Sequence, residues 1–321
     1  MRTRWHMRPF ASERDYWLLR PLLRESYRLN GRLERSWQVY RWDYCHWHVY
    51  PTVIEQPAED AVLIWESPAG EPIAALLSEA WGDVTPQVHP AWRCEALERE
   101  MILAAEEHLS APRGEGRALT LWAHADDPLR RGILQERGYE PWPGPEHQRW
   151  QDLPVARPAP GPPAGYALRS LGGPEDLPAR VRASWLAFHP GDPYGDDDPS
   201  WYPERIQRAP LYRRDLDLVA VAPDGSLAGF ATIWYDDVTR AAAFEPVGVA
   251  PEHRRRGLGR ALMEEGLRRA QWMGATRAHV ASYGAAAHAT YASVGFTRYH
   301  LCERWQRTWE PADIPTDASP R

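Results

Sequence analysis

The two halves of this 321-residue chain resemble one another, which restricts it to folds that can be built twice. Val88 to Arg93 lies over Val249 to Arg254 at an offset of about 160 residues, and Gly138-Tyr139 corresponds to Gly295-Phe296 in the same way. Both segments pass from an apolar run to a basic residue ahead of a helical pattern. We therefore predict a tandem duplication of one α/β fold.

A proline-rich stretch separates the halves. Residues 153–165 cannot sustain a helix or a sheet ladder, because proline lacks the backbone N–H and fixes φ, and such a stretch favours an extended linker. The sequence thus predicts a first domain over 1–152, a linker over 153–165, a second domain over 166–309 and a tail over 310–321.

Hydrophobic periodicity predicts mixed helices and strands in both halves. In the second half the predicted strands are 166–170, 216–222, 227–235, 242–249, 277–282 and 296–307, and the predicted helices are 175–188, 202–208, 258–273 and 286–294. In the first half we predict helices over 13–29, 38–48, 95–109 and 128–137, a hairpin within 61–79 and a strand over 119–124.

Residues 245–259 form the most informative segment. A β-branched strand runs into Arg254-Arg-Arg-Gly-Leu-Gly259 and then directly into an amphipathic helix. Glycines at 257 and 259 let backbone N–H groups approach a diphosphate, and the positive end of the following helix points to the same place. The segment predicts a pyrophosphate-binding turn, with a solvated helix start as the alternative.

Two spaced motifs in the second half point to a known family. The Arg254-x-x-Gly-x-Gly259 turn, followed by Tyr291-Ala-Ser-Val-Gly-Phe296, resembles the GNAT superfamily of acyl-coenzyme A dependent N-acyltransferases. The tandem arrangement is similar to that of mycothiol synthase-like proteins, although no residue here indicates that substrate. The resemblance implies an α/β fold of two tandem GNAT-like domains, each with a mixed, mostly antiparallel central sheet flanked by helices.

The same resemblance implies a reaction and a set of site residues. Acetyl-CoA would be the cosubstrate, and a primary amine would attack the acyl thioester directly through a tetrahedral intermediate. Tyr291 is the expected general acid, and its alternative is a packing role. Glu245 is the expected base, since strand alternation would place it on the same face as Val247; its alternative is to end a hairpin or pair with an arginine. The expected acetyl-CoA-binding residues are Val247, Gly248, Val249, Arg254, Arg255, Arg256, Gly257, Leu258, Gly259 and Arg260.

Other polar residues near these motifs are weaker candidates. His253 and His288 could act as bases, and Ser282 or Tyr283 could relay a proton from the end of a strand. Gly284 departs from the family pattern, which often has an asparagine seven residues before the tyrosine.

The first half is expected to lack the acyl-CoA site. In the overlay Ala96 and Glu98 replace the glycines at 257 and 259, and Leu134 replaces the tyrosine. Val84 takes the place of the candidate base. A carboxylate at the helix start would repel a diphosphate by roughly one to several kcal/mol at close range.

Composition excludes several function classes. A net charge of −6 argues against a general nucleic-acid binder, with the arginine turn too local to reverse it. The three cysteines are widely separated and indicate neither disulfides nor a metal site. No apolar run is long enough to span a membrane, so we expect a cytoplasmic protein with no membrane partner.

The acceptor cannot be identified from the sequence beyond a small-molecule or peptide amine. The acidic run from Asp192 to Asp198 could attract a cationic amine or could be a solvated loop. Trp37, Tyr40, Tyr44 and Trp47 recur at helical spacing, which is typical of a core and also compatible with a cleft wall. A homodimer stays open. The alternative function is a non-catalytic acyl-CoA-binding regulatory protein.

Overall fold

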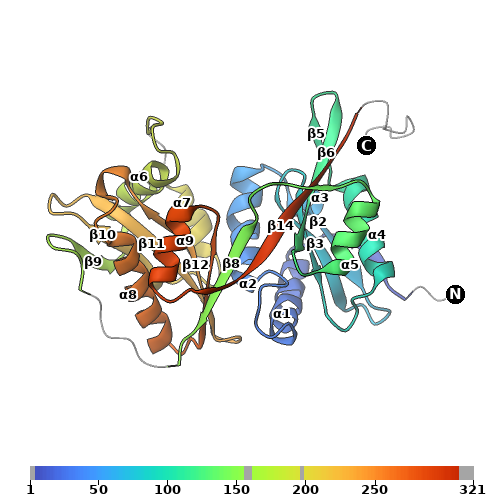
Figure 1. The fold of residues 1–321 in the computed structure, drawn as a ribbon, viewed down its shortest axis with the longest axis horizontal. Coiled ribbons are helices and arrows are strands. Elements are labelled where there is room, and N and C mark those ends of the chain that lie inside the picture. Colours follow the sequence, from blue (N-terminus) through green and yellow to red (C-terminus); the bar gives the residue numbers. More distant parts are fainter. Residues whose placement is uncertain (1–3, 155–160, 196–198, 311–321) are drawn as a thin grey trace. The chain divides into compact units, whose positions relative to one another are not determined.

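The protein forms two compact units. A computed structural model describes residues 4–154, 161–195 and 199–310 (Figure 1). One unit contains Met1–Glu146 and His300–Arg321, and the other contains His147–Tyr299. Within the described ranges no helix is both long and apolar enough to cross a membrane.

The first unit is built on a mixed sheet with the strand order β1-β2-β3-β4-β6-β14, in which β5 pairs with β6 and β7 with β14. Its parallel pair is β4 with β6; the other pairs are antiparallel. The strands are β1 (His6–Pro9), β2 (Val62–Glu66), β3 (Pro72–Ala80), β4 (Asp83–Val88), β5 (Ala111–Arg113), β6 (Gly116–His124), β7 (Glu140–Pro141) and β14 (Arg298–Trp309). The helices are α1 (Glu13–Leu29), α2 (Val39–Tyr44), the π-helix η1 (Cys45–Val53), α3 (Ala58–Ala61), α4 (Glu95–His108) and α5 (Pro128–Glu136).

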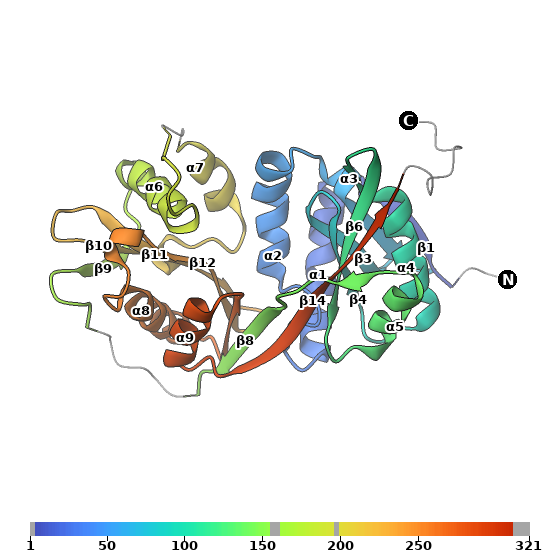
Figure 2. The ribbon, with the colours of Figure 1, turned by 45° about the horizontal axis from the view of Figure 1, so that its top comes forward.

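Helices cover both faces of this sheet. Strand β2 is buried along its whole length, and its side chains alternate between two cores: Val62 and Ile64 pack with α1 and α2, whereas Leu63 and Trp65 pack with α4 and α5. Figure 2 shows the two helix pairs on opposite sides of β3. The aromatic stripe at 37–47 belongs to the first of these cores, which confirms its interpretation as core.

The second unit has the strand order β8-β13-β12-β11-β10-β9, with β12 and β13 parallel and the other pairs antiparallel. The strands are β8 (Glu146–Asp152), β9 (Ala167–Ser170), β10 (Asp217–Val221), β11 (Leu227–Asp236), β12 (Ala241–Val249) and β13 (Arg277–Ser282). The helices are α6 (Leu177–Phe188), α7 (Trp201–Arg205), α8 (Leu258–Trp272) and α9 (Ala285–Ser293), with short 3-10 turns at Pro174–Asp176, Ile206–Arg208, Arg214–Leu216 and Pro251–His253.

The second sheet is also covered on both faces. Helices α8 and α9 pack on one face through an apolar core that includes Leu262, Leu267 and Tyr291. On the other face Arg180 of α6 lies over the ring of Phe230, 3.9 Å from its centroid. Figure 2 shows α6 and α8 on opposite sides of β11 and β12. Each unit therefore has the predicted mixed, mostly antiparallel sheet flanked by helices.

The domain boundaries expected at 152 and 166 are wrong, because the last strand of each half joins the sheet of the other unit. Residues 147–152 of β8 pair antiparallel with β13. Residues 302–309 of β14 pair antiparallel with β6. Backbone hydrogen bonds thus place β8, from the first half of the chain, in the second unit. They place β14, from the second half, in the first unit. Residues 155–160 of the expected linker and 311–321 of the expected tail lie outside the described residues.

Most predicted elements are present. Helix α1 begins and ends as predicted, and the predicted helices at 95–109, 128–137, 258–273 and 286–294 are each found within one residue. The predicted helix at 38–48 instead divides into α2 and a π-helix. Strands β1, β4, β5, β7 and β8 were not predicted. The sequence of β8, Glu-His-Gln-Arg-Trp-Gln-Asp, is too polar to show a strand pattern.

Candidate active site

The central parallel pair of the second unit separates part of the way along. Strands β12 and β13 pair through Ala241–Ala243 and Arg277–His279. Beyond this point β12 follows β11 as far as Val249, and β13 follows β8 as far as Ser282. Side chains from Glu245 to Val247 are half-buried, whereas residues 241–244 are buried. The two strands therefore leave backbone and side chains of β12 accessible between them.

A β-bulge lies where the strands separate. Glu245 and Pro246 together oppose Thr232 of β11, because Phe244 pairs with Ile233 and Val247 pairs with Ala231. The indole Nε1 of Trp234 donates a 2.6 Å hydrogen bond to the Glu245 carbonyl. The expectation that Glu245 and Val247 share a face assumed a regular strand, and the bulge interrupts that alternation.

The backbone beyond the bulge presents donors toward the open side. The amide of Ala250 donates to the carbonyl of Ala228, at 3.0 Å, which fixes this residue on the β11 side. Because backbone groups alternate along a strand, Gly248 also faces β11, and the amides of Val247 and Val249 face the side that β13 has left. A side chain at 248 has no room: a Cβ there would lie 2.5 Å from Cζ of Phe230 and 2.8 Å from Cβ of Ala187.

Tyr291 lies on α9, packed in the core beneath this opening. It is 9% exposed. Burial first, and the nearby Glu245 carboxylate second, raise the pKa of Tyr291 to about 12. The phenol is therefore protonated at neutral pH. The expected acid and the expected base are 46 residues apart in the sequence, and in the structure they lie close enough to interact electrostatically.

The arginine and glycine turn contains one arginine committed to structure and two that face solvent. Arg254 donates to the carbonyl of Val249 at 3.1 Å and to that of Ala187 at 2.9 Å. Arg255 and Arg256 are exposed and have no ion-pair partner among the described residues. Arg255 has a φ of 61°. Arg260 pairs with Glu264 on the same helix at 2.8 Å.

The two glycines of this turn leave the start of α8 open. Gly257, the N-cap, has a φ of 84°, a conformation that disfavours other residues. A Cβ at Gly257 would lie 3.8 Å from Cγ of Pro163, an ordinary contact distance, so the described residues do not crowd this position. Gly259 lies against Thr290 of α9, 3.5 Å from where its Cβ would be. The glycine turn thus leads directly into α8, and Leu258, the first residue of that helix, is buried.

Comparison with known proteins identifies the family of this region. Residues 182–296 match the model of the Acetyltransferase (GNAT) family. Residues 182–296 thus form a GNAT-family domain. A mycothiol acetyltransferase of Tsukamurella paurometabola is 29% identical over 264 residues, covering 78% of this chain and 82% of that protein. The family match and this relative together support the conclusion that the protein is an N-acetyltransferase.

Two solved structures share the fold over nearly the whole chain. A GCN5-related N-acetyltransferase from Sphaerobacter thermophilus has a TM-score of 0.67 at 20% identity and covers 96% of both chains. A tandem GNAT protein from the clavulanic acid biosynthesis pathway has a TM-score of 0.66 at 19% identity, covering 98% of this chain and 100% of that one.

The GNAT domain also contains a polar cluster that sequence reasoning missed in part. Ser282 Oγ lies 2.8 Å from His288 Nδ1, which connects two of the weaker candidates. Arg149 of β8 donates to the same Ser282 Oγ at 3.0 Å and is 6% exposed. His147, on the same strand, stacks on Tyr299 with a centroid distance of 4.5 Å. The correspondence of Trp150 with Trp305 could have located β8, but not its partner strand.

The remaining candidates have structural partners or lie at the surface. His253 Nδ1 is 3.0 Å from the Tyr166 hydroxyl. Tyr283 is 57% exposed. Gly284 is the N-cap of α9 and has no side chain to cap it. Asp192 is exposed, and Asp196–Asp198 of the acidic run lie outside the described residues.

The equivalent region of the first unit is built differently. Strands β4 and β6 also separate, after Asp83–Val84 and Thr120–Leu121. There the N-cap of α4 is Cys94, so alignment of the helix starts places Cys94 and Ala96 opposite the two glycines. This shifts the sequence overlay by two residues and still leaves no glycine at either position. Helix α5 places Leu134 where α9 has Tyr291.

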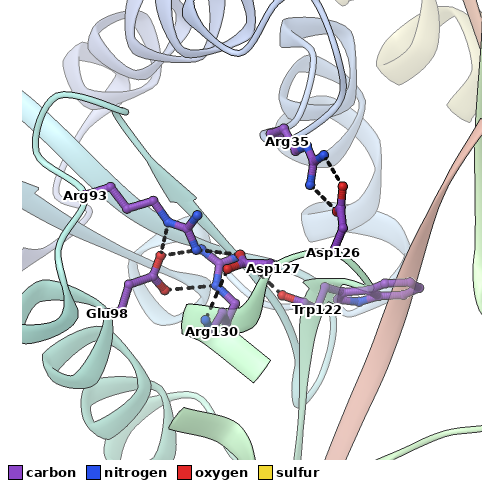
Figure 3. Close-up of polar contacts among 7 residues, drawn as sticks. All are labelled: Arg35, Arg93, Glu98, Trp122, Asp126, Asp127 and Arg130. Carbon is purple, nitrogen blue, oxygen red and sulfur yellow. Dashed lines mark hydrogen bonds and ion pairs between the residues drawn. The ribbon is translucent and has the colours of Figure 1, made fainter. Parts of the chain in front are cut away.

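Glu98 fills the first turn of α4 with a buried ion-pair network (Figure 3). It is fully buried and accepts hydrogen bonds from Arg130 at 2.9 Å and from Arg93 at 2.7 Å. Burial alone would raise the pKa of Glu98, but Arg130 and Arg93 outweigh that effect and lower it. The arginines nearest this helix start are thus neutralised by protein carboxylates.

Proposed function

We propose that the GNAT domain transfers an acetyl group from acetyl-CoA to a primary amine of a small molecule or peptide. The observation that carries this proposal is that Glu245 lies where β12 separates from β13 and that its carboxylate, after burial, contributes to the raised pKa of Tyr291. The first unit separates its strands in the same way but has Val84 and Leu134 at these positions. The geometry therefore favours chemistry in the second unit.

The residues present fit acetyl-CoA. The described residues do not crowd Gly257, and they supply no ion-pair partner for Arg255 and Arg256, which precede it. A diphosphate is held well by such a combination of helix N-terminus, flexible backbone and guanidinium groups. The amides of Val247 and Val249 would hold the pantetheine arm and the acyl carbonyl. When bound, acetyl-CoA supplies an activated acyl thioester.

Each polar residue then has a distinct task. Amides held on a rigid strand stabilise charge that develops on a carbonyl oxygen, because they need no reorganisation. Tyr291 holds a proton on its phenol oxygen at neutral pH and can donate it to a thiolate, whose unperturbed pKa is about 8.5. Glu245 accepts the proton of the ammonium group, directly or through a water, before the amine can attack.

The acceptor proposed here is a small-molecule amine, with a peptide amine as the other member of the class. The support is the relative from Tsukamurella paurometabola, which is named for mycothiol and matches over most of its length.

A two-step experiment tests this function. Acetyl-CoA is titrated calorimetrically into the full-length protein, and thiol release is then followed over a panel of amino sugars, aminoglycosides, polyamines and peptides. We expect binding, and thiol release that depends on one class of amine. Binding without release across the whole panel would indicate a non-catalytic acyl-CoA-binding protein instead. Absence of binding would overturn both functions.

A further inference from the structure

The first unit contains a cavity at the separated ends of β4 and β6, outside the proposed acetyl-CoA site. Its volume is about 480 Å³, within the usual range for small-ligand sites. The wall is formed by the segment after α1, the residues after β4, and the turn from β6 into α5. The charged and polar residues among its lining are Asn30, Arg35, Arg93, His124, Asp126, Asp127 and Arg130.

Two separate ion-pair groups line this cavity. Arg35 pairs with Asp126 in a two-pronged contact, with Nη2 to Oδ2 at 2.6 Å. Arg93 pairs with Asp127 and with the buried Glu98. Figure 3 shows Arg93 and the Arg35–Asp126 pair on opposite sides of Asp127. The cavity therefore has a cationic group at one side and an accessible carboxylate at the other.

Each group keeps capacity for a ligand. Arg93 uses Nε and Nη2 for its two carboxylates, and in the described part of the chain its Nη1 donates no hydrogen bond. The side chain of Arg93 is 32% exposed. The Asp126 carboxylate is 55% exposed, and hydrogen bonding to Arg35 lowers its pKa to about 2, so it stays charged at neutral pH.

His124 adds an unsatisfied polar atom to the same wall. His124 is 5% exposed, and its Nδ1 is buried without a hydrogen-bond partner among the described residues. Burial, with a smaller contribution from Arg35, lowers the pKa of His124 to about 3, so the ring is neutral. A buried polar atom without a partner destabilises the fold, and a ligand or water can satisfy it.

We propose that this cavity binds a small zwitterion of the amino-acid type, with its carboxylate at Arg93 and its ammonium group at Asp126. A dipolar ligand presents one charge of each sign, which matches the guanidinium of Arg93 and the carboxylate of Asp126. Acetyl-CoA does not fit this description, because Glu98 already occupies the arginines beside α4. The site is thus distinct from the proposed acetyl-CoA site in residues, charge and unit.

Calorimetric titration of the full-length protein tests the ligand class. The probes are glycine, β-alanine and 4-aminobutanoate, which separate the two charges by different lengths, together with acetate and methylammonium as single-charge controls. We expect at least one zwitterion to bind about tenfold more tightly than either control, the gain from one added charge-assisted contact. The proposal would be overturned if acetate bound as tightly as the best zwitterion. It would also be overturned if no zwitterion bound at concentrations up to about 10 mM.

Matched variants test the site and the orientation. Asp126→Asn should weaken zwitterion binding about tenfold. Asp152→Asn is the control, because Asp152 is also an exposed, arginine-paired aspartate but lies in the other unit. Arg35→Gln removes the competitor of the ammonium group and should leave binding equal or tighter. Loss of binding in Arg35→Gln, or equal loss in both aspartate variants, would contradict the assignment.

Discussion

The carboxylate of Glu245 on β12 lies close enough to Tyr291 on α9 to contribute, after burial, to the raised pKa of its phenol. Burial first and this carboxylate second raise the pKa of Tyr291 to about 12. The two side chains are placed by different elements, a helix and a bulged strand, at the point where β12 separates from β13. With its pKa raised, the Tyr291 phenol keeps its proton to higher pH than an ordinary tyrosine does.

Removal of the Tyr291 hydroxyl tests the acid assignment. We expect Tyr291→Phe to lower kcat by about 10²- to 10⁴-fold, because general acid catalysis contributes in that range. Affinity for acetyl-CoA should stay within about twofold, since the hydroxyl acts on the leaving group. Tyr283→Phe, at an exposed tyrosine, is the control and should leave kcat unchanged. Equal turnover of Tyr291→Phe and the wild type would refute the role.

The pH dependence of kcat reports the Tyr291 pKa. A phenol with the usual pKa of about 10 would be roughly three-quarters ionised at about pH 10.5 and would lose activity there. With the pKa raised to about 12, the wild type should show no such loss. Glu245→Gln removes one of the two causes of the shift, so the alkaline limb should move to lower pH. The measurement is the rate of thiol release between about pH 7 and about pH 10.5, from which the rate of uncatalysed thioester hydrolysis at each pH is subtracted. An alkaline limb that is identical in both proteins would contradict the coupling.

The arginines of the turn should separate into binding and structural residues. Replacing Arg255 and Arg256 with alanine should raise the KM for acetyl-CoA about tenfold, or about 1.4 kcal/mol. The effect should shrink at high salt, because exposed charges are screened. Arg254→Ala should lower the melting temperature instead, since Arg254 bridges the carbonyls of Val249 and Ala187. The opposite pattern, with Arg254 affecting only KM, would be inconsistent with the observed contacts.

Gly248 tests how closely α6 packs on β12. Gly248→Ala should reduce the free energy of unfolding by about 1–3 kcal/mol, because the new Cβ overlaps Phe230 and Ala187. Gly132→Ala provides the control. Gly132 lies in α5 with open space around it, and alanine there should stabilise by up to about 1 kcal/mol. Denaturant unfolding of both variants gives the comparison, and a neutral Gly248→Ala would show that α6 can move away.

Much of the local structure follows from the sequence. Helix α1 begins at Glu13 and ends at Leu29, as its periodicity predicts, and α8 begins at the glycine turn. The substitution of the cradle glycines in the first half was visible without a structure, although aligned helix starts change the matched residues to Cys94 and Ala96. These features depend on neighbours within a few residues, which is the range over which propensity and capping act.

The residues missed at the site share one cause. Arg149 and His147 lie on β8, a polar strand with no hydrophobic alternation to reveal it. The bulge at Glu245 was equally hidden, because it is defined by the pairing of β12 with β11 and not by the residues of β12 alone. Their contributions depend on contacts between segments far apart in the chain.

The sequence alone determined most of the helices, the glycine turn before α8 and the half of the chain that carries this turn. Only the tertiary structure decided which sheet receives the last strand of each half. Strands β8 and β14 end equivalent repeats, and the period-two pattern of a strand specifies which face is buried without specifying its partner. Any strand can form the backbone hydrogen bonds that select its partner strand. The assignment of Arg149 to the second unit could therefore come only from the fold.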